Sequence, residues 1–332
     1  MDAVLSRSAG GPDALVVEKC PVPEPQHGQV LVKVHAIGVN YPDLLIIEDR
    51  YQFKPARPFS PGAEISGEIV ALGAGVSGLR VGQRVMAMLG WGGMAGYVCV
   101  DAAKCAPIPD SMPFDHAAAF LMTYGTSYYA LKDRGGLSAG ETLLVLGAGG
   151  GVGLAAVELG RAMGARVVAA ASSDEKLHAA SAAGASATVR YPTGELARDQ
   201  QKALSEAFKS ACGNDGASVI YDAIGGDYAE PALRAIAWEG RYLVVGFPAG
   251  IPKLPLNLTL LKSCDVRGVF WGAAIDRNPA RHVEAVGELL SLYQDGKIAP
   301  SIHQSFPLAQ AADALRALAS RGVVGKVIIT VE

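Results

Sequence analysis

The chain has few cysteines, and they are not arranged as a disulfide framework or a metal site. Five cysteines are spread over 332 residues, and no two form a C-x-x-C pair. They are Cys20, Cys99, Cys105, Cys212 and Cys264. A disulfide framework needs a dense and even set, and a zinc knuckle needs paired cysteines. The sequence therefore predicts free thiols that pack as small hydrophobic side chains.

An excess of positive charge is also missing. The chain has 29 Lys and Arg against 32 Asp and Glu, which gives a formal net charge of -3. Nucleic acids and anionic membranes favour proteins with a basic surface. Neither is expected as a partner of this protein.

Long apolar runs are absent, although half of the residues are hydrophobic. No stretch approaches the ~20 apolar residues that a membrane-spanning helix needs. The first residues, Met1 to Val4, do not begin a charged segment followed by an apolar run, which is the pattern of a signal peptide. We expect a cytoplasmic protein that makes no membrane contact.

The pattern of hydrophobic residues changes near residue 120. Before that point, short apolar runs at 30–35, 64–72 and 84–89 are separated by Gly and Pro, which predicts a compact β-rich domain. A helical period follows at 114–132, and strands and helices then alternate. The expected strands are 142–146, 166–171, 187–190, 218–221, 241–245 and 265–270, and the expected helices are 152–163, 174–183, 195–210 and 228–237. This alternation predicts a doubly wound parallel sheet of the Rossmann type.

The last 62 residues are expected to return to the first domain. They contain two helical patterns, at 279–295 and 308–320, and a final strand at 325–331. The predicted domains are therefore 1–122, 123–270 for the Rossmann unit, and 271–332 completing the first domain.

A glycine-rich segment, 146–153, joins the first strand of the alternating series to its helix. A dinucleotide needs a tight turn, a close approach of the backbone to the pyrophosphate, and close packing of helix on strand, which small residues spaced as G-x-G-x-x-G provide. The best match has Ala148 in place of the first glycine. The predicted contacts with the dinucleotide are Ala148, Gly150, Gly151, Val152 and Gly153.

The end of the second strand lacks the carboxylate that binds the ribose 2′-hydroxyl of NAD. Ala171 stands there, followed by Ser172, Ser173 and Lys176. Small neutral groups and one cation fit a 2′-phosphate, so the sequence favours NADPH. In the alternative interpretation, Ser173 or Asp174 caps a helix and Lys176 is solvated; the two roles are compatible.

Several further motifs occur in a fixed order. They are Gly38 to Asn40 with Asp43, Tyr51, Pro61 to Glu64 with Gly67, Val81 to Val85, Gly96-Tyr97, Thr126, Gly147 to Gly153, Tyr221-Asp222 with Gly225, and Gly325-Lys326. With these motifs the chain resembles the medium-chain dehydrogenase/reductase superfamily, in its zinc-free quinone oxidoreductase, or zeta-crystallin-like, branch. The resemblance implies a GroES-like β-rich catalytic domain into which the Rossmann domain is inserted, and reduction by NADPH.

Zinc ligands are missing at the positions that the resemblance identifies. Asn40 and Ala63 stand where zinc-dependent relatives have a cysteine and a histidine, and no cysteine lies between Cys105 and Cys212. The expected protein therefore contains no metal. Without a metal to polarise an alcohol, a quinone or an activated enone is the expected acceptor.

The resemblance also assigns site residues. Asn40 would orient the nicotinamide or bind a substrate oxygen, and Tyr51 would donate a hydrogen bond to a carbonyl, whereas Leu45 replaces a second tyrosine of the family. The implied cofactor contacts are Thr126, then Lys176, Tyr191 and Arg321 for the 2′-phosphate and adenine, and Gly246, Phe247, Phe270 and Trp271 near the nicotinamide. Structural alternatives stay open: a turn-stabilising Asn40, a surface aromatic at Tyr51, and hydrogen-bonding roles for Asp43 and Asp222.

The predicted function is that of an NADPH-dependent quinone oxidoreductase. An enoyl or enone reductase acting on a C=C bond and a non-catalytic NADPH-binding protein are the alternatives. The resemblance further implies a homodimer formed through the edge strand at 265–270, because an unpaired apolar edge favours aggregation.

Overall fold

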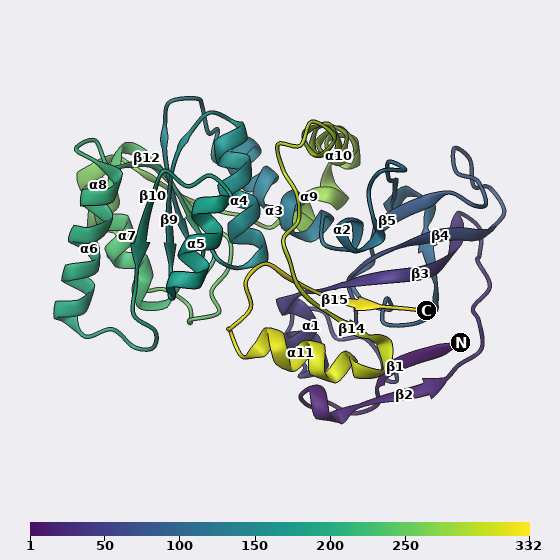
Figure 1. Cartoon of the computed structure of the whole chain (residues 1–332). Coiled ribbons are helices and arrows are strands. Elements are labelled where there is room, and N and C mark those ends of the chain that lie inside the picture. Colours follow the sequence, from purple (N-terminus) through teal and green to yellow (C-terminus); the bar gives the residue numbers. More distant parts are fainter. The chain divides into compact units, whose positions relative to one another are not determined.

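The computed structural model describes residues 1–332, which form two compact units (Figure 1). Unit 1 comprises Met1–Met122 and Pro300–Glu332, and unit 2 comprises Thr123–Ala299. The chain thus leaves unit 1 once and returns to it at Pro300. The sequence placed this return at residue 271, so 271–299 belongs to a different unit from the one expected.

Contacts within unit 2 explain this difference. The helices α9 (Trp271–Arg277) and α10 (Pro279–Gln294) follow the last strand of the sheet. The Trp271 ring covers Gly125 so closely that a Cβ there would lie 2.3 Å from it. Arg281 forms an ion pair with Asp133 at 3.0 Å. The strand and helix alternation ends at 270, but these contacts hold the next two helices to the same unit.

Unit 1 is built around the long central strand β3 (Gln29–Val39). The sheet order is β14-β15-β3-β4-β5-β7, and β6 also pairs with β3. The other strands are β4 (Glu64–Leu72), β5 (Arg84–Met88), β6 (Tyr97–Asp101), β7 (Cys105–Pro107), β14 (Ile302–Pro307) and β15 (Lys326–Thr330), with β1 (Asp2–Ser6) and β2 (Leu15–Lys19) forming a separate two-stranded sheet. Because β15 pairs antiparallel with β3, Val327 lies opposite Val39. The last strand of the chain is thereby placed beside the end of the first long one.

The helices of unit 1 are short. They are α1 (Tyr41–Ile47), α2 (Phe114–Ala118) and α11 (Ala311–Ala319). The single helix expected at 114–132 is instead divided into α2, two π-helical turns at Leu121–Gly125 and Tyr129–Arg134, and α3 (Thr126–Tyr128). The division between the two units falls within this segment.

Unit 2 contains a six-stranded parallel sheet with the order β10-β9-β8-β11-β12-β13. Its strands are β8 (Thr142–Leu146), β9 (Arg166–Ala171), β10 (Ala187–Arg190), β11 (Ala217–Asp222), β12 (Ile236–Val244) and β13 (Asp265–Gly268). If these six strands are numbered from 1 to 6 in chain order, their order in the sheet is 3-2-1-4-5-6, which is that of a Rossmann fold. The predicted doubly wound sheet is confirmed.

Helices cover both faces of this sheet (Figure 1). The helices that pack on its strands are α4 (Gly151–Ala162), α5 (Asp174–Ala182), α6 (Arg198–Cys212), α7 (Ala229–Arg234) and α8 (Asn257–Lys262), and unit 2 also contains α3, α9 and α10. Since both faces are covered, the central strands are buried on both sides: Leu143 to Leu146 are fully inaccessible to solvent. No helix in either unit combines the length and hydrophobicity needed to cross a membrane.

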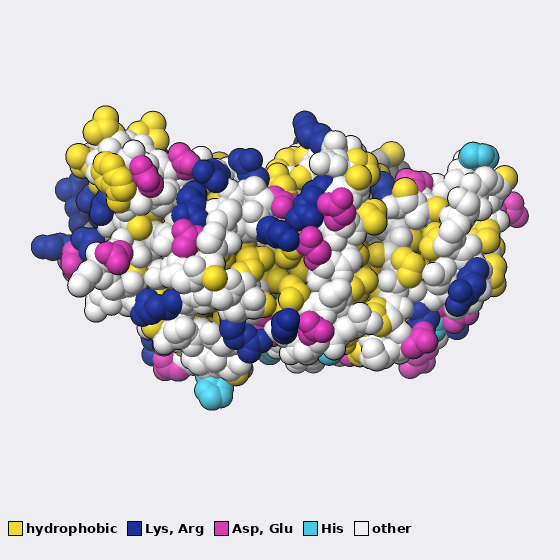
Figure 2. All heavy atoms as spheres, turned by 90° about the horizontal axis from the view of Figure 1, so that it is seen from above, with side chains coloured by type: hydrophobic (Ala, Val, Ile, Leu, Met, Phe, Trp, Pro, Cys, Tyr) yellow, Lys and Arg dark blue, Asp and Glu magenta, His cyan; other side chains and the backbone are white.

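One end of unit 2 carries exposed apolar side chains. Figure 2 shows hydrophobic side chains gathered at the end that carries α8. Leu260 is 78% exposed and Ile251 79%, and Leu256, Leu261 and Val266 are also exposed. Val266 lies on β13, which is the edge strand of the sheet.

Candidate active site

The glycine-rich turn lies at the carboxyl end of β8, between the ends of β9 and β11. The direction of chain winding reverses at this place, which is where α/β sheets bind ligands. Gly147 has φ of +78°, a left-handed conformation that a side chain disfavours. The N–H groups of Gly147 and Ala148 both donate to the carbonyl of Ala170, at 3.1 and 3.0 Å. The tight turn is thus made by Gly147, which lies one residue before the Ala148-x-Gly150-x-x-Gly153 match.

The next glycines have two different roles. A Cβ on Gly153 would lie 2.1 Å from the carbonyl oxygen of Gly147, so α4 packs on the turn only because residue 153 has no side chain. A Cβ on Gly150 would meet no atom nearer than Gly147 O at 3.7 Å. The space beside Gly150 is therefore open to a ligand.

The first N–H groups of α4 suit an anion. The helix begins at Gly151, and its first hydrogen bond runs from Leu154 N to Gly150 O at 2.8 Å. The preceding N–H groups, on Gly151, Val152 and Gly153, have no acceptor within the helix, and the helix dipole adds positive potential there. A pyrophosphate fits this end of α4, so the residues present can hold a dinucleotide.

Lys176 lies over the same turn. A Cβ on Gly149 would be 2.4 Å from Cγ of Lys176, so the aliphatic part of this side chain covers Gly149. Ser173 caps α5 by accepting a hydrogen bond from Lys176 N at 3.4 Å. Asp174 forms an exposed ion pair with Arg190 at 2.9 Å. Ser173 thus caps α5, as in the alternative interpretation, and Lys176 also lies beside the glycine turn.

Tyr191 follows β10 and lies beside the end of β9. Its N–H donates to the carbonyl of Ala171 at 3.0 Å, and its ring lies 4.9 Å from that of Tyr228. Burial raises the pKa of Tyr191. Ala171 and Tyr191 are thereby neighbours, with Ser172 directly after Ala171.

Asp222 organises the loop after β11. One carboxylate oxygen accepts hydrogen bonds from the N–H groups of Ile224 and Gly225, both at 2.9 Å, and the other accepts from the Tyr242 hydroxyl at 2.6 Å. Ile224 in turn packs on the glycine turn, where its Cγ2 would lie 3.0 Å from a Cβ on Gly147. This geometry agrees with the hydrogen-bonding role that the sequence left open for Asp222.

Thr126 lies on α3, and its neighbour Ser127 connects that helix to the glycine turn. The Ser127 hydroxyl donates to the carbonyl of Val152 at 2.9 Å and lies 2.9 Å from the Tyr221 hydroxyl. Sequence reasoning missed Ser127, because a serine beside a predicted contact carries no signal of its own.

The four residues assigned near the nicotinamide differ in exposure. Gly246 donates to the carbonyl of Asp222 at 3.2 Å, and Phe247 packs on Gly225. The side chains of Phe247 and Phe270 are exposed, whereas Trp271 is only 7% exposed, against Gly125 and His282. Trp271 thus has a packing role within unit 2.

In unit 1, Asn40 lies between β3 and α1 with its side chain buried. Its amide nitrogen donates to the carbonyl of Gly38 at 3.0 Å and to Oε2 of Glu64 at 3.1 Å. Its amide oxygen accepts from Nζ of Lys326 at 2.7 Å. The sequence had placed Lys326 in a motif without a role, and it had not connected Glu64 with Asn40.

Asp43 is a structural residue in this geometry. It accepts hydrogen bonds from the backbone N–H groups of Asn40 at 2.8 Å and of Gly62 and Ala63 at 3.2 Å. Burial raises the pKa of Asp43 to about 6. The carboxylate thus fixes the loop at Gly62 and the start of α1.

Two further residues of unit 1 were assigned to the site. Tyr51 is half-buried with its ring 5.8 Å from that of Phe53, and burial and the charge of Asp43 raise the pKa of its phenol. It therefore remains a hydrogen-bond donor. Arg321 is exposed after α11, with a left-handed φ of +60°.

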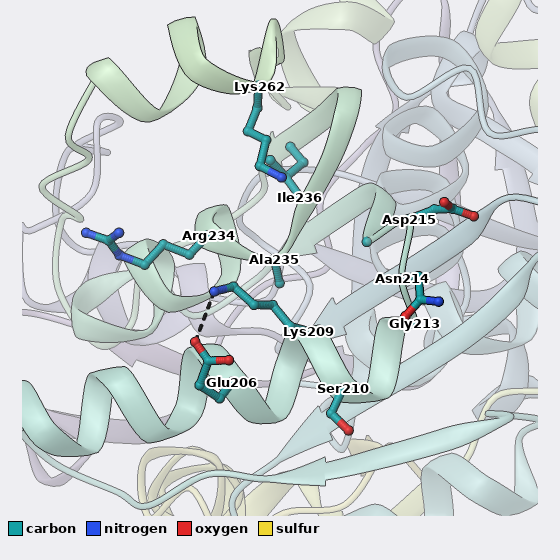
Figure 3. Close-up of a pocket in the computed structure, with 11 residues that line it drawn as sticks. Glu206, Lys209, Ser210, Gly213, Asn214, Asp215, Arg234, Ala235, Ile236 and Lys262 are labelled. Carbon is teal, nitrogen blue, oxygen red and sulfur yellow. Dashed lines mark hydrogen bonds and ion pairs between the residues drawn. The ribbon is translucent and has the colours of Figure 1, made fainter.

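No group of three or more His, Cys, Asp or Glu side chains is arranged to hold a metal ion. A surface pocket in unit 2 is lined by mixed charges, among which Lys209 pairs with Glu206 at 3.0 Å (Figure 3). It lies where α6 ends and β11 and β12 begin. The glycine turn is at the opposite ends of the strands, and no predicted site residue lines the pocket.

Known proteins match the whole chain. A family model described as the alcohol dehydrogenase GroES-like domain matches residues 26–110, and one described as zinc-binding dehydrogenase matches residues 151–289. The quinone oxidoreductase-like protein 2 homolog of Nematostella vectensis is 40% identical over 332 residues, which covers 98% of this chain and 88% of that protein.

Two solved structures have the same fold over nearly their full length. The quinone oxidoreductase of Thermus thermophilus, described alone and with NADPH, has a TM-score of 0.84 and 32% identity over 99% of this chain and 100% of that one. The Escherichia coli quinone oxidoreductase complexed with NADPH has a TM-score of 0.90 and 27% identity, again over 99% and 100%.

Proposed function

Because the chain belongs to the quinone oxidoreductase-like branch of the medium-chain dehydrogenase/reductase superfamily, we propose that it is an NADPH-dependent quinone reductase. The observation that supports this most is the glycine turn, with open space at Gly150 and Lys176 over Gly149. The turn suits a pyrophosphate, and the lysine brings a cation to a place where β9 ends without a carboxylate.

NADPH binds at the carboxyl edge of the unit 2 sheet. Its pyrophosphate lies on the N–H groups that begin α4, and its 2′-phosphate meets Ser172, Ser173 and Lys176, with Tyr191 and Arg321 completing that site. Thr126, Gly246, Phe247 and Phe270 are the proposed neighbours of the nicotinamide half. Trp271 supports them from its buried position against Gly125.

When bound, NADPH supplies a hydride to the acceptor. The chain's own residues position the reactants and exclude water from them. Asn40 contacts the nicotinamide, and Tyr51 donates a hydrogen bond to the acceptor's carbonyl oxygen through its phenol, which is protonated at neutral pH. A quinone accepts a hydride without a metal to polarise it.

An acceptor panel tests this function. NADPH oxidation is followed with a series of quinones, a series of enones, and both NADPH and NADH. We expect turnover with quinones and a preference for NADPH. Turnover with enones alone would identify a C=C reductase, and tight NADPH binding without turnover on any acceptor would identify a non-catalytic binding protein.

We predict that activity needs no metal. The side-chain amide of Asn40 makes hydrogen bonds with Gly38, Glu64 and Lys326. The side chain of Ala63 offers no atom that could bind a metal. Elemental analysis should find far less than one zinc per chain, and incubation with a chelator should leave the rate of NADPH oxidation unchanged. Zinc at one per chain, removed together with activity, would contradict the proposal.

We further propose that the protein is a homodimer joined through β13. The edge strand β13 exposes unpaired N–H and C=O groups, and pairing with a second copy satisfies them. Val266 on β13 and the exposed Leu256, Leu260 and Leu261 of the α8 region provide the apolar surface that stable interfaces bury.

Light scattering at micromolar concentration should therefore give the mass of a dimer. Val266→Lys places a charge in the proposed interface and should shift the mass towards the monomer. Val283→Lys on α10 is the matched control, because Val283 is also exposed, and it should leave the mass unchanged. A monomeric wild type would refute the dimer.

A further inference from the structure

The partners of Asn40 determine which way its amide faces. Lys326 Nζ lies 2.7 Å from Oδ1, and an ammonium group only donates hydrogen bonds. Gly38 O and Glu64 Oε2, at 3.0 and 3.1 Å from Nδ2, only accept them. Rotating the amide by half a turn would therefore set donor against donor and acceptor against acceptor. Only one orientation satisfies all three contacts.

The two charged partners are themselves buried and satisfied. Lys326 is 5% exposed and Glu64 is fully buried. The three N–H groups of Lys326 have three acceptors, which are Asn40 Oδ1, Val39 O at 3.1 Å and Glu64 Oε2 at 3.3 Å. The second oxygen of Glu64 accepts from Met122 N at 2.8 Å. Neither charge is left without its partner, which is what a buried ion pair requires.

The fold brings these groups together by close backbone approach. The register of β15 with β3 places Val327 opposite Val39, so Lys326 lies next to Asn40. A Cβ on Gly38 would be 2.8 Å from Glu64 Oε2 and 2.0 Å from the carbonyl of Ala118. Glycine at position 38 is what allows the Glu64 carboxylate to reach the amide.

We propose that Lys326, held by Glu64, is a positioning residue that makes Asn40 a hydrogen-bond acceptor only. Both N–H bonds of the amide are used within unit 1, and one lone pair of Oδ1 remains. Asn40 therefore cannot donate to a quinone carbonyl. It recognises an N–H donor, and the carboxamide NH2 of the nicotinamide is that donor. The consequence for the cofactor rests on the proposed function, but the fixed orientation of the amide does not.

The fixed orientation is measured without any substrate. The chain has four asparagines, and Asn214, Asn257 and Asn278 are exposed. In protein labelled with 15N in the asparagine side chains, we expect the Asn40 NH2 protons to exchange with solvent roughly 100-fold more slowly than the other three pairs. Four pairs that exchange alike would overturn the proposal.

The role of the ion pair is tested by removing both charges together. Lys326→Met with Glu64→Gln removes both charges of the ion pair, so neither of these two charges is left buried without the other. We expect the slow exchange of Asn40 to disappear. The matched control is Lys209→Met with Glu206→Gln, which removes an exposed lysine–glutamate pair and should leave Asn40 protected. Slow exchange that persists in the first variant would overturn the positioning role.

Lys326→Arg gives a second variant that keeps the buried charge. A planar guanidinium cannot direct three N–H bonds from one nitrogen to Val39, Asn40 and Glu64. The exchange of Asn40 should therefore lie between that of the wild type and that of the neutral variant. Protection equal to the wild type would show that the ammonium geometry is not needed.

The cofactor contact is read from an NADPH analogue whose carboxamide is replaced by an acetyl group. The analogue offers no N–H donor, so the wild type should bind it about 2- to 10-fold more weakly than NADPH, the effect of one hydrogen bond. This ratio of dissociation constants should fall in the neutral variant, and an unchanged ratio would overturn the contact. A wild type that binds no NADPH while Asn40 stays protected would refute the proposed function and uphold the positioning of the amide.

Discussion

Replacing Gly150 by alanine should weaken NADPH binding roughly 10- to 100-fold and leave the folded protein as stable as before. An added Cβ would have no protein atom within 3.7 Å, and φ of −85° with ψ of 169° is an ordinary extended conformation for alanine. The only group that the methyl would displace is the pyrophosphate proposed to lie there. Losing one or two charge-assisted hydrogen bonds there costs about 1.5–3 kcal/mol, which corresponds to that loss of affinity.

Gly153→Ala is the matched variant, because its Cβ would lie 2.1 Å from the carbonyl oxygen of Gly147. The helix α4 must move away from the turn, so this change should lower both NADPH affinity and the free energy of unfolding, the latter by about 1–3 kcal/mol. Titration calorimetry with NADPH and urea denaturation measure the two quantities. Unchanged affinity in Gly150→Ala would contradict the assignment of the turn, and a large loss of stability would contradict the open space beside it.

The position of the glycine turn could be predicted from the local sequence pattern, but its detailed conformation could not. A strand, a run of small residues and a helix are adjacent in sequence, so the Rossmann sheet and the place of the turn could be predicted. The alanine at position 148 was matched to the first glycine of the motif. The structure shows that the left-handed residue is Gly147, because φ is set by the hydrogen bonds of the turn rather than by the spacing of the motif.

Contacts between distant segments could not be predicted in this way. Lys326 and Asn40 are 286 residues apart, and only the register of β15 on β3 reveals that they meet. The packing of Trp271 on Gly125 similarly decides that α9 and α10 belong to unit 2. Neither residue carries a periodic or motif signal for its partner, so the boundary at Pro300 and the partners of Asn40 required the structure.

Lys176→Ala should weaken NADPH binding about 10- to 100-fold and should barely affect NADH. The reason is that a hydrogen bond to a charged group contributes roughly 1.5–3 kcal/mol, and only NADPH carries the 2′-phosphate that Lys176 is proposed to contact. Arg321 compensates in part if it contacts the same phosphate, which moves the loss towards 10-fold.

The contact of Lys176 with Gly149 calls for a second variant. The aliphatic part of the lysine covers the glycine turn, so alanine removes both this cover and the charge. Lys176→Met keeps most of the aliphatic chain and removes only the charge. If the phosphate contact causes the effect, the two variants lose NADPH affinity equally and keep their affinity for NADH.

Dissociation constants of both cofactors for the wild type and the two variants decide the question. A loss in Lys176→Ala that Lys176→Met does not share would show that Lys176 acts by covering Gly149. Equal losses for NADPH and NADH would show that it acts on the turn or on general charge. A wild type that binds both cofactors alike would remove the basis for the 2′-phosphate site, because Ala171 offers NADH no carboxylate and Lys176 would then give NADPH no advantage.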